Sequence, residues 1–416
     1  MDGVYYMTLC DNKKIIVVEP GSSMMYISEA IKMLGYQPIV LASIKEYSGD
    51  QKSYLEKSGY YEVDAKSVDN IINCIEENQL TNIHGILSTA DRYIIPACLA
   101  AERLGIKGMD PALLKLNNKI DVFNLIQEFS PSSIIINYKN IPWDELDEML
   151  QKYGAIVVKP SKSAGGKGII EIKSTDGLST LNSFLINEKK VDLLNQDLIV
   201  QPKLEGTLYS VEGYVKDGVP IYIGLSKRTR IGCTESRNEF PTETYNPELF
   251  SKMKSIVEAL IKRSSYCNGY FHAEFLADEH YTVLIDANFG RVGGGGIALQ
   301  IAHSYGVPIE KLYSHVVDIT LLENKIYNGS IYCGSRRDTM FIQYSTESSG
   351  VFENLETSEP LKSYHVQMAE KGKRLQPVGQ NNNSLVGILV GDVKDVLLDI
   401  THITVHTDQG IFTPVY

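Results

Sequence analysis

The first hundred residues alternate short apolar runs with helical patterns. Runs at 13–20, 38–42 and 83–88 predict strands, and the segments between and after them (24–37, 67–78 and 91–105) have helical periodicity, with Asp91 as an N-cap. Strands that alternate with helices in short cycles favour a parallel sheet covered by helices. The loop 19–23 follows the first strand, where such folds bind ligands, but it is not a GxGxxG dinucleotide loop.

Length and charge restrict the remaining possibilities. The chain has 416 residues, too many for one ordinary core, and a net charge of −11 without a sustained basic cluster. Nucleic acid is therefore not an expected partner. No apolar run approaches the ~20 residues of a membrane span, and the N-terminal residues lack a signal-peptide pattern. Six scattered cysteines without a CxxC pair favour reduced thiols. We expect a cytoplasmic protein.

A hairpin at 270–296 carries the clearest candidate for a metal site. Two strand-like segments, 271–275 and 282–286, flank a polar turn, and their pairing brings Glu274 close to Asp286 and Asn288. Carboxylate and amide oxygens are ligands that Mg²⁺ accepts when it also holds phosphate oxygens. Arg291 and the glycines 293–296, including Gly294, follow as donors for an oxyanion. The alternative is a set of solvated carboxylates and an ordinary surface loop.

A second motif joins a strand to a flexible loop. The strand 156–160 contains Lys159 and runs into SKSAGGKG, in which Ser163, Gly165, Gly166 and Gly168 leave backbone N–H groups open to an anion. It is not a Walker loop, because Gly168 stands where that motif requires Ser or Thr.

Taken in order, these landmarks resemble the ATP-grasp superfamily. Its metal-binding pattern is Glu…Glu-x-Asn-x-Arg; here Asp286 replaces the second Glu, and one extra residue precedes Arg291. The resemblance implies that Lys119 and Lys159 contact the nucleotide phosphates and that the Gly loop closes over them as a lid.

The resemblance extends to the segment between the two ATP-grasp subdomains. There, 200–204 align with the backbone that contacts adenine, which implies nucleotide contacts for Gln201, Lys203 and Leu204. Leu208 stands where many members carry a ribose-binding Glu, so Glu205 is the expected substitute. Glu212 is either an outer acidic group of the site or a strand residue.

The polar segment 228–245 is interpreted as an irregular loop. Within it, Glu235, Asn238 and Pro241 match the Glu-x-x-His-x-x-Pro spacing of L-amino-acid ligases, the bacilysin-synthetase-like dipeptide synthetases. This resemblance implies that Glu235 and Asn238 line an amino-acid pocket. If the carboxylates there are uncompensated, the pocket favours Arg or Lys over Asp or Glu; if Glu235 only meets the α-ammonium group, it shows no preference.

The resemblance implies a mixed α/β and α+β architecture. We expect a Rossmann-like N-terminal domain (1–112), a small central lid subdomain (113–203) and a larger β-rich C-terminal subdomain (204–416) that carries the metal and amino-acid site.

The implied activity joins two L-amino acids into a dipeptide through an acyl phosphate, releasing ADP and phosphate. The cofactors would be ATP and two Mg²⁺ ions, for which Mn²⁺ can substitute; the partners would be free L-amino acids, with a homodimer as a further possibility. Two alternatives stay open: a biotin-carboxylase-like or other ATP-grasp ligase, and a non-catalytic ATP-binding protein of the same fold.

Overall fold

The structure is a computed structural model. It describes residues 13–137, 140–162, 168–174, 176–187, 196–232, 234–379 and 385–416, without the side chains of 184–187. The predicted lid residues Ser163, Gly165 and Gly166 lie outside the described residues.

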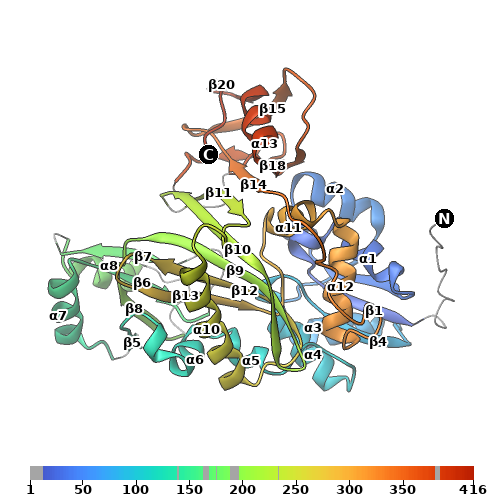
Figure 1. Cartoon of the computed structure of the whole chain (residues 1–416), viewed down its shortest axis with the longest axis horizontal. Coiled ribbons are helices and arrows are strands. Elements are labelled where there is room, and N and C mark those ends of the chain that lie inside the picture. The colour runs from blue at the N-terminus through green and yellow to red at the C-terminus, as the bar shows by residue number, and fades with distance from the viewer. Residues whose placement is uncertain are drawn as a thin grey trace.

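A four-stranded parallel sheet forms the N-terminal part, in the order β3-β2-β1-β4. Figure 1 shows this part in blue and cyan, with its helices around the sheet. The predicted strands and helices are present there, and α2 is an additional helix that periodicity did not indicate, because only its Leu55 is buried. The strands are β1 (Lys14–Val18), β2 (Gln37–Ala42), β3 (Tyr61–Glu62) and β4 (Ile83–Leu87). The helices are α1 (Ile27–Met33), α2 (Gly49–Ser58), α3 (Val68–Glu77) and α4 (Asp91–Arg103), with 3-10 turns at Gly21–Ser23 and Ile44–Glu46.

Asp91 is the first residue of α4 rather than its N-cap, which is Ala90. Its carboxylate is engaged elsewhere, by Arg291 of the C-terminal part. The N-cap prediction was therefore wrong by one residue.

A smaller antiparallel sheet in the order β5-β8-β6-β7 follows. Its apolar face packs on α7 through residues such as Leu146, Leu150 and Ile156. The strands are β5 (Ile134–Ile136), β6 (Ala155–Pro160), β7 (Ile170–Lys173) and β8 (Leu198–Pro202). The helices of this part are α5 (Leu113–Leu116), α6 (Lys119–Leu125), α7 (Trp143–Tyr153) and α8 (Ser179–Asn187), with a 3-10 turn at Gln127–Phe129.

An eight-stranded antiparallel sheet organises the rest, in the order β13-β12-β9-β10-β11-β14-β18-β16. Its strands are β9 (Thr207–Lys216), β10 (Val219–Ile231), β11 (Thr234–Phe240), β12 (Gly269–Ala277), β13 (Thr282–Phe289), β14 (Thr339–Tyr344), β16 (Tyr364–Gln367) and β18 (Gly387–Asp392). The accompanying helices are α10 (Pro247–Ser264), α11 (Ile297–Tyr305) and α12 (Ile309–Leu321). The expected irregular loop at 228–245 is wrong in large part, because it contains the end of β10 and all of β11.

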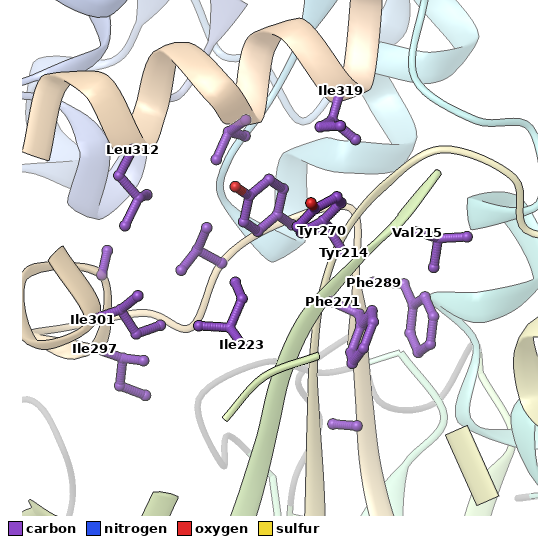
Figure 2. Close-up of a cluster of buried hydrophobic side chains, with 14 of the residues drawn as sticks. Tyr214, Val215, Ile223, Tyr270, Phe271, Phe289, Ile297, Ile301, Leu312 and Ile319 are labelled. Atoms are coloured by element: carbon purple, nitrogen blue, oxygen red, sulfur yellow. The ribbon is translucent and has the colours of Figure 1, made fainter. Parts of the chain in front are cut away.

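The two faces of this sheet differ in chemistry. Phe271 and Phe289 stack on one another in the apolar core. Tyr214 and Tyr270 instead lie toward the helix that carries Leu312 and Ile319 (Figure 2). Further along the face of Tyr270, cross-strand neighbours are polar: Glu212 pairs with His272, and Glu274 with Asp286. Such pairs share a sheet face, so the polar side chains form one continuous row.

The C-terminal residues add a fourth sheet in the order β17-β15-β19-β20 (Figure 1). It consists of β15 (Gly350–Thr357), β17 (Arg374–Leu375), β19 (Ile403–Thr407) and β20 (Gly410–Phe412), with α13 (Val393–Asp399) and a 3-10 turn at Ile400–His402. Strand β16 of the large sheet contacts the N-terminal part, since the Tyr26 and Tyr364 hydroxyls lie 2.6 Å apart. No helix in the described ranges is long and apolar enough to cross a membrane.

Candidate active site

A cavity of about 1000 Å³ lies where the small sheet, strand β13, the start of α4 and the segment of α5 and α6 meet. Apolar side chains line part of it, and lysines, carboxylates and amides line the rest. The lining includes Asp91, Leu116, Asn118, Lys119, Val122, Phe123, Lys159, Lys162, Gly168, Gln196, Ile199, Gln201, Leu284, Asp286 and Asn288. A cleft with an apolar portion and a few converging charges is typical of small-molecule sites.

Lys119 bridges two parts of the chain across this cavity. It is the first residue of α6, whose N-cap Asn118 accepts a hydrogen bond from the backbone N–H of Ile120. Its Nζ donates to Asp286 Oδ1 at 2.6 Å. Burial opposes the positive charge, but the neighbouring Asp286 carboxylate raises the pKa of Lys119 above its usual value. The lysine is therefore a permanent cation beside the candidate metal ligand.

Lys159 lines the same cavity from β6. Burial, and then the positive charge of Lys119, lowers its pKa to about 8. Two lysines that repel each other in one cavity favour a polyanionic ligand, which would relieve the repulsion. The predicted pair of phosphate-binding lysines is thus brought together by the fold.

The residues predicted to contact the nucleotide base and ribose separate into two groups. Gln201 lines the cavity, where its amide donates to the hydroxyl of Ser133 at 2.8 Å. The described lining does not include Lys203, Leu204 or Glu205. Lys203 pairs with Glu171 at 2.9 Å, and the Glu205 side chain is 86% exposed. Gly168, the described end of the lid loop, is at the cavity with φ +74°.

Of the three predicted metal ligands, two are among the described residues that line the cavity and one is not. Glu274 and Asp286 are cross-strand partners, so the hairpin pairs as expected. Asp286 and Asn288 line the cavity, whereas Glu274 is not among the described lining residues. Within the described ranges, no three His, Cys, Asp or Glu side chains converge as a preformed metal site would require. Asp286 and Asn288 supply the hard oxygen donors that suit Mg²⁺ when phosphate oxygens complete its shell.

Glu274 instead belongs to a buried network of charges. Its Oε1 lies 2.8 Å from Arg228 Nη1 and 3.2 Å from His272 Nε2. Although burial raises the pKa of Glu274, Arg228 and His272 hold it well below the usual value. The His272 Nδ1 faces Glu212 Oε1 at 2.6 Å. Burial opposes protonation of His272, but Glu212 and Glu274 raise its pKa to about 9.

Glu235 forms a bidentate ion pair with Arg228 from the next strand. The distances are 2.9 Å from Nε to Oε1 and 2.6 Å from Nη2 to Oε2. Glu239 is likewise paired, 3.3 Å from Arg237 Nε. The premise that these carboxylates leave an uncompensated negative charge is therefore wrong, and with it the argument for a preference for Arg or Lys.

Asn238 is fully buried on β11, directly opposite Arg228 of β10. Neither polar atom of its side chain has a hydrogen-bond partner among the described residues. The backbone carbonyl of Asn238 accepts a hydrogen bond from the side-chain amide of Gln300 at 3.0 Å. Asn238 lies beside the charged network and is not among the described cavity-lining residues, so its place in an amino-acid pocket stays a prediction.

Arg291 reaches back to the N-terminal part of the chain. It forms a bidentate ion pair with Asp91, in which Nη2 lies 2.7 Å from Oδ2, and its Nη1 donates to the Val292 carbonyl. Burial opposes its charge, but Asp91 raises the pKa of Arg291. Gly294 lies in the following loop, where an added Cβ would approach only Arg291, at 3.9 Å.

Sequence reasoning missed three residues of this site: Asp91 as an ion-pair partner, Arg228 and His272. His272 lies between the apolar residues Phe271 and Ala273 of β12, an alternation typical of a strand with one polar face, and this was a usable signal. Arg228 lies between Lys227 and Thr229 on β10, so no such alternation marked it. Nothing in the sequence indicated that Asp91 lies opposite a residue 200 positions away.

The chain has the ATP-grasp fold, as the structural comparisons show. Solved structures similar to it include L-amino acid ligase from Bacillus licheniformis, with a TM-score of 0.74, 13% identity and coverage of 95% of this chain and 99% of that one. Phosphoribosylglycinamide synthetase from Anaerococcus prevotii has a TM-score of 0.70 and 15% identity, over 96% of this chain and 100% of that one.

A third similar structure is the biotin carboxylase domain of Hydrogenobacter thermophilus 2-oxoglutarate carboxylase, a dimer in complex with MgADP and bicarbonate. Its TM-score is 0.69 with 16% identity, over 96% of this chain and 91% of that one. No protein-family model matches the chain, and no curated protein sequence matches it significantly. The predicted fold class is confirmed, and at these identities the likeness concerns the fold alone.

Proposed function

We propose that this chain is an ATP-dependent, ADP-forming ligase that joins a carboxylate to an amine, with two L-amino acids as its substrates. One observation carries the proposal: a single cavity holds Lys119, Lys159, Asp286 and Asn288, and its lining residue Asp91 is paired with Arg291. The two lysines with Asp286 and Asn288 suit a nucleoside triphosphate and its cation. The Asp91–Arg291 pair suits a zwitterion.

The nucleotide half of the proposal rests on charge. Lys119 and Lys159 would neutralise phosphate oxygens, which removes their mutual repulsion. Asp286 and Asn288 would hold Mg²⁺, which supplies charge neutralisation on the transferred phosphoryl group when bound. Once Lys119 turns to phosphate, its present partner Asp286 is released for that role. The similar biotin carboxylase domain is in complex with MgADP, which supports this assignment by analogy of fold.

The reaction that fits these groups has two steps. A carboxylate oxygen attacks the terminal phosphorus and the bond to the β-phosphate breaks, which gives an acyl phosphate and ADP. The amine nitrogen then attacks the acyl carbon, and the carbon–oxygen bond to phosphate breaks. The substrate ammonium loses two protons in total; one ends on the released phosphate and the other in solvent. Arg291 and the backbone N–H groups of the loop at Gly293–Gly296 would stabilise the tetrahedral oxyanion.

Recognition of a free amino acid follows from the Asp91–Arg291 pair. An α-ammonium group can take the place of Arg291 at Asp91, while the α-carboxylate takes the place of Asp91 at Arg291. A zwitterion thus exchanges one buried ion pair for two without leaving a charge uncompensated. The similarity to L-amino acid ligase from Bacillus licheniformis supports this choice of substrate class.

The test is ADP and phosphate release with all pairs of the twenty amino acids, followed by mass spectrometry of the products. We expect amino-acid-dependent ADP release and a dipeptide, both lost in Asp286→Asn. Turnover with bicarbonate and no amine would instead indicate a carboxylase-like reaction. No turnover with any amino acid would contradict the dipeptide assignment. The cytoplasmic location and the homodimer stay predictions.

A further inference from the structure

The charged network at Glu274 bears on how many divalent ions the site takes, a question that rests on the proposed function. Glu274 and Asp286 are neighbours on adjacent strands, but the positively charged side chains that pair with them differ. Asp286 is held by Lys119, a flexible side chain at the start of a helix that lines the cavity. Glu274 is held by Arg228, from the middle of the large sheet.

Arg228 is fixed in place by its other contacts. Its side chain is only 5% exposed, and Glu235 holds both Nε and Nη2 in a bidentate pair. The remaining nitrogen, Nη1, points to Glu274 Oε1 at 2.8 Å. A guanidinium cannot lose its charge in a protein, and its planar geometry locks both carboxylates at once. Moving it would take its bidentate contact from Glu235 and would leave the buried Glu274 with only His272 and the more distant Arg230 as neighbouring cations.

Glu274 has little capacity left for a divalent ion. One oxygen already accepts from Arg228 and lies near His272, and the other lies 3.8 Å from Arg230. A divalent cation bound to this carboxylate would therefore sit beside fixed positive charge in a poorly solvated site, where repulsion is strong. Asp286 and Asn288 have no such fixed cation, because Lys119 can move to a phosphate oxygen.

We propose that Arg228 is a fixed cation that replaces a second metal ion at Glu274, so that the site takes one divalent ion, on Asp286 and Asn288. Glu274 then acts as a positioning residue that orients the Arg228 guanidinium over the polar sheet face. The arrangement keeps one cation at this point in every state of the reaction.

The experiment counts Mn²⁺ ions by the loss of the free-ion electron paramagnetic resonance signal, with the full chain and a saturating non-hydrolysable ATP analogue. We expect one Mn²⁺ per chain. Two ions per chain would overturn the inference while leaving the proposed nucleotide site intact. No Mn²⁺ binding with the analogue would overturn both.

Three variants assign the ion to its ligands. Asp286→Asn should weaken Mn²⁺ binding at least tenfold, whereas Glu274→Gln should change it less than about threefold, as should the control Asp278→Asn in the hairpin turn. An equal loss in Glu274→Gln and Asp286→Asn would overturn the inference.

Arg228→Gln should bind a second ion at Glu274. A folded Arg228→Gln variant that still binds only one Mn²⁺ ion would refute the role of Arg228. If Arg228→Gln does not fold, the inference is tested by the number of Mn²⁺ ions that the wild type binds and by the Mn²⁺ affinity of Glu274→Gln.

Discussion

Asp91 and Arg291, 200 residues apart in the chain, form a bidentate ion pair that ties the first turn of α4 to the loop after β13. The Arg291 side chain is buried, whereas that of Asp91 is 27% exposed and lines the cavity. The pair therefore joins the N-terminal part to the loop after β13, and under the proposed function it presents opposite charges where a zwitterion would bind.

Asp91→Asn should separate amino-acid recognition from nucleotide binding. Without the carboxylate, Arg291 keeps a buried charge that has lost its ion-pair partner, which costs on the order of 3–5 kcal/mol. We expect at least a tenfold fall in amino-acid-dependent ADP release, with affinity for a non-hydrolysable ATP analogue changed less than about threefold. Asp69→Asn, which breaks the exposed pair with Arg103, is the matched control. An unchanged KM for both amino acids would contradict the assignment.

Binding of the nucleotide should take up a proton above pH 8. The pKa of Lys159 is about 8 in the free protein, so its charge is present below that pH and is lost as the pH rises through it. Phosphate favours the charged lysine, so affinity should be flat below pH 8 and fall about tenfold per unit above it. Calorimetry in buffers of different ionisation enthalpy measures the uptake. Lys159→Arg, always charged, should flatten the profile; a flat profile in the wild type would refute the prediction.

Glu19, at the end of β1, should make the fold less stable as the pH rises. Burial raises its pKa to about 7, although Ser43 and Tyr47 donate to its oxygens. The folded state holds a proton that the unfolded chain releases near pH 4.5, so stability falls between about pH 4.5 and pH 7.

Thermal melts at pH 5 and pH 8 test this effect. Relative to Glu19→Gln, the wild type should lose about 2 kcal/mol between the two values. Glu29→Gln, at an exposed position of α1, should show no such difference. If Glu19→Gln and the wild type respond alike to pH, the pKa assignment is wrong.

Two adjacent glycines should respond differently to the same change. A Cβ on Gly293 would lie 2.7 Å from Ile297 and 2.9 Å from His272 Nδ1, whereas one on Gly294 meets only Arg291, at 3.9 Å. Gly293→Ala should therefore lower stability by about 1–3 kcal/mol and displace His272. Gly294→Ala keeps its N–H and should leave the melting temperature nearly unchanged. Equal melting temperatures for the two variants would contradict this prediction, because they would show that the loop backbone shifts to accommodate the added Cβ.

The parts of the fold with a local signal were predictable. The strand and helix alternation and the hairpin 270–296 each show their periodicity within a few residues. In contrast, β11 was mistaken for a loop, because its charged residues suggested solvent exposure. Their partners come from β10, and a single sequence does not show which strand lies beside which.

In the candidate site, too, residues within local motifs were predictable and long-range partners were not. Lys119, Lys159, Asp286 and Asn288 were found from motifs, and the fold brings them to one cavity. The role of Glu274 was inferred from the same motif, yet its surroundings depend on Arg228, 46 residues earlier in the chain. Long-range ion pairs of this kind, like Asp91 with Arg291, are fixed by tertiary packing and leave no local trace.

The order of strands in the large sheet also has a consequence for synthesis of the protein. Strand β14 covers the edge of β11, and β18 and β16 follow it outward. While the ribosome is still making residues beyond 339, β11 carries unpaired backbone groups that another chain can pair with. Chains truncated before β14 should thus aggregate even though every residue of the cavity is already present. The last fifth of the polypeptide, from β14 onward, therefore protects the sheet edge once it has been made.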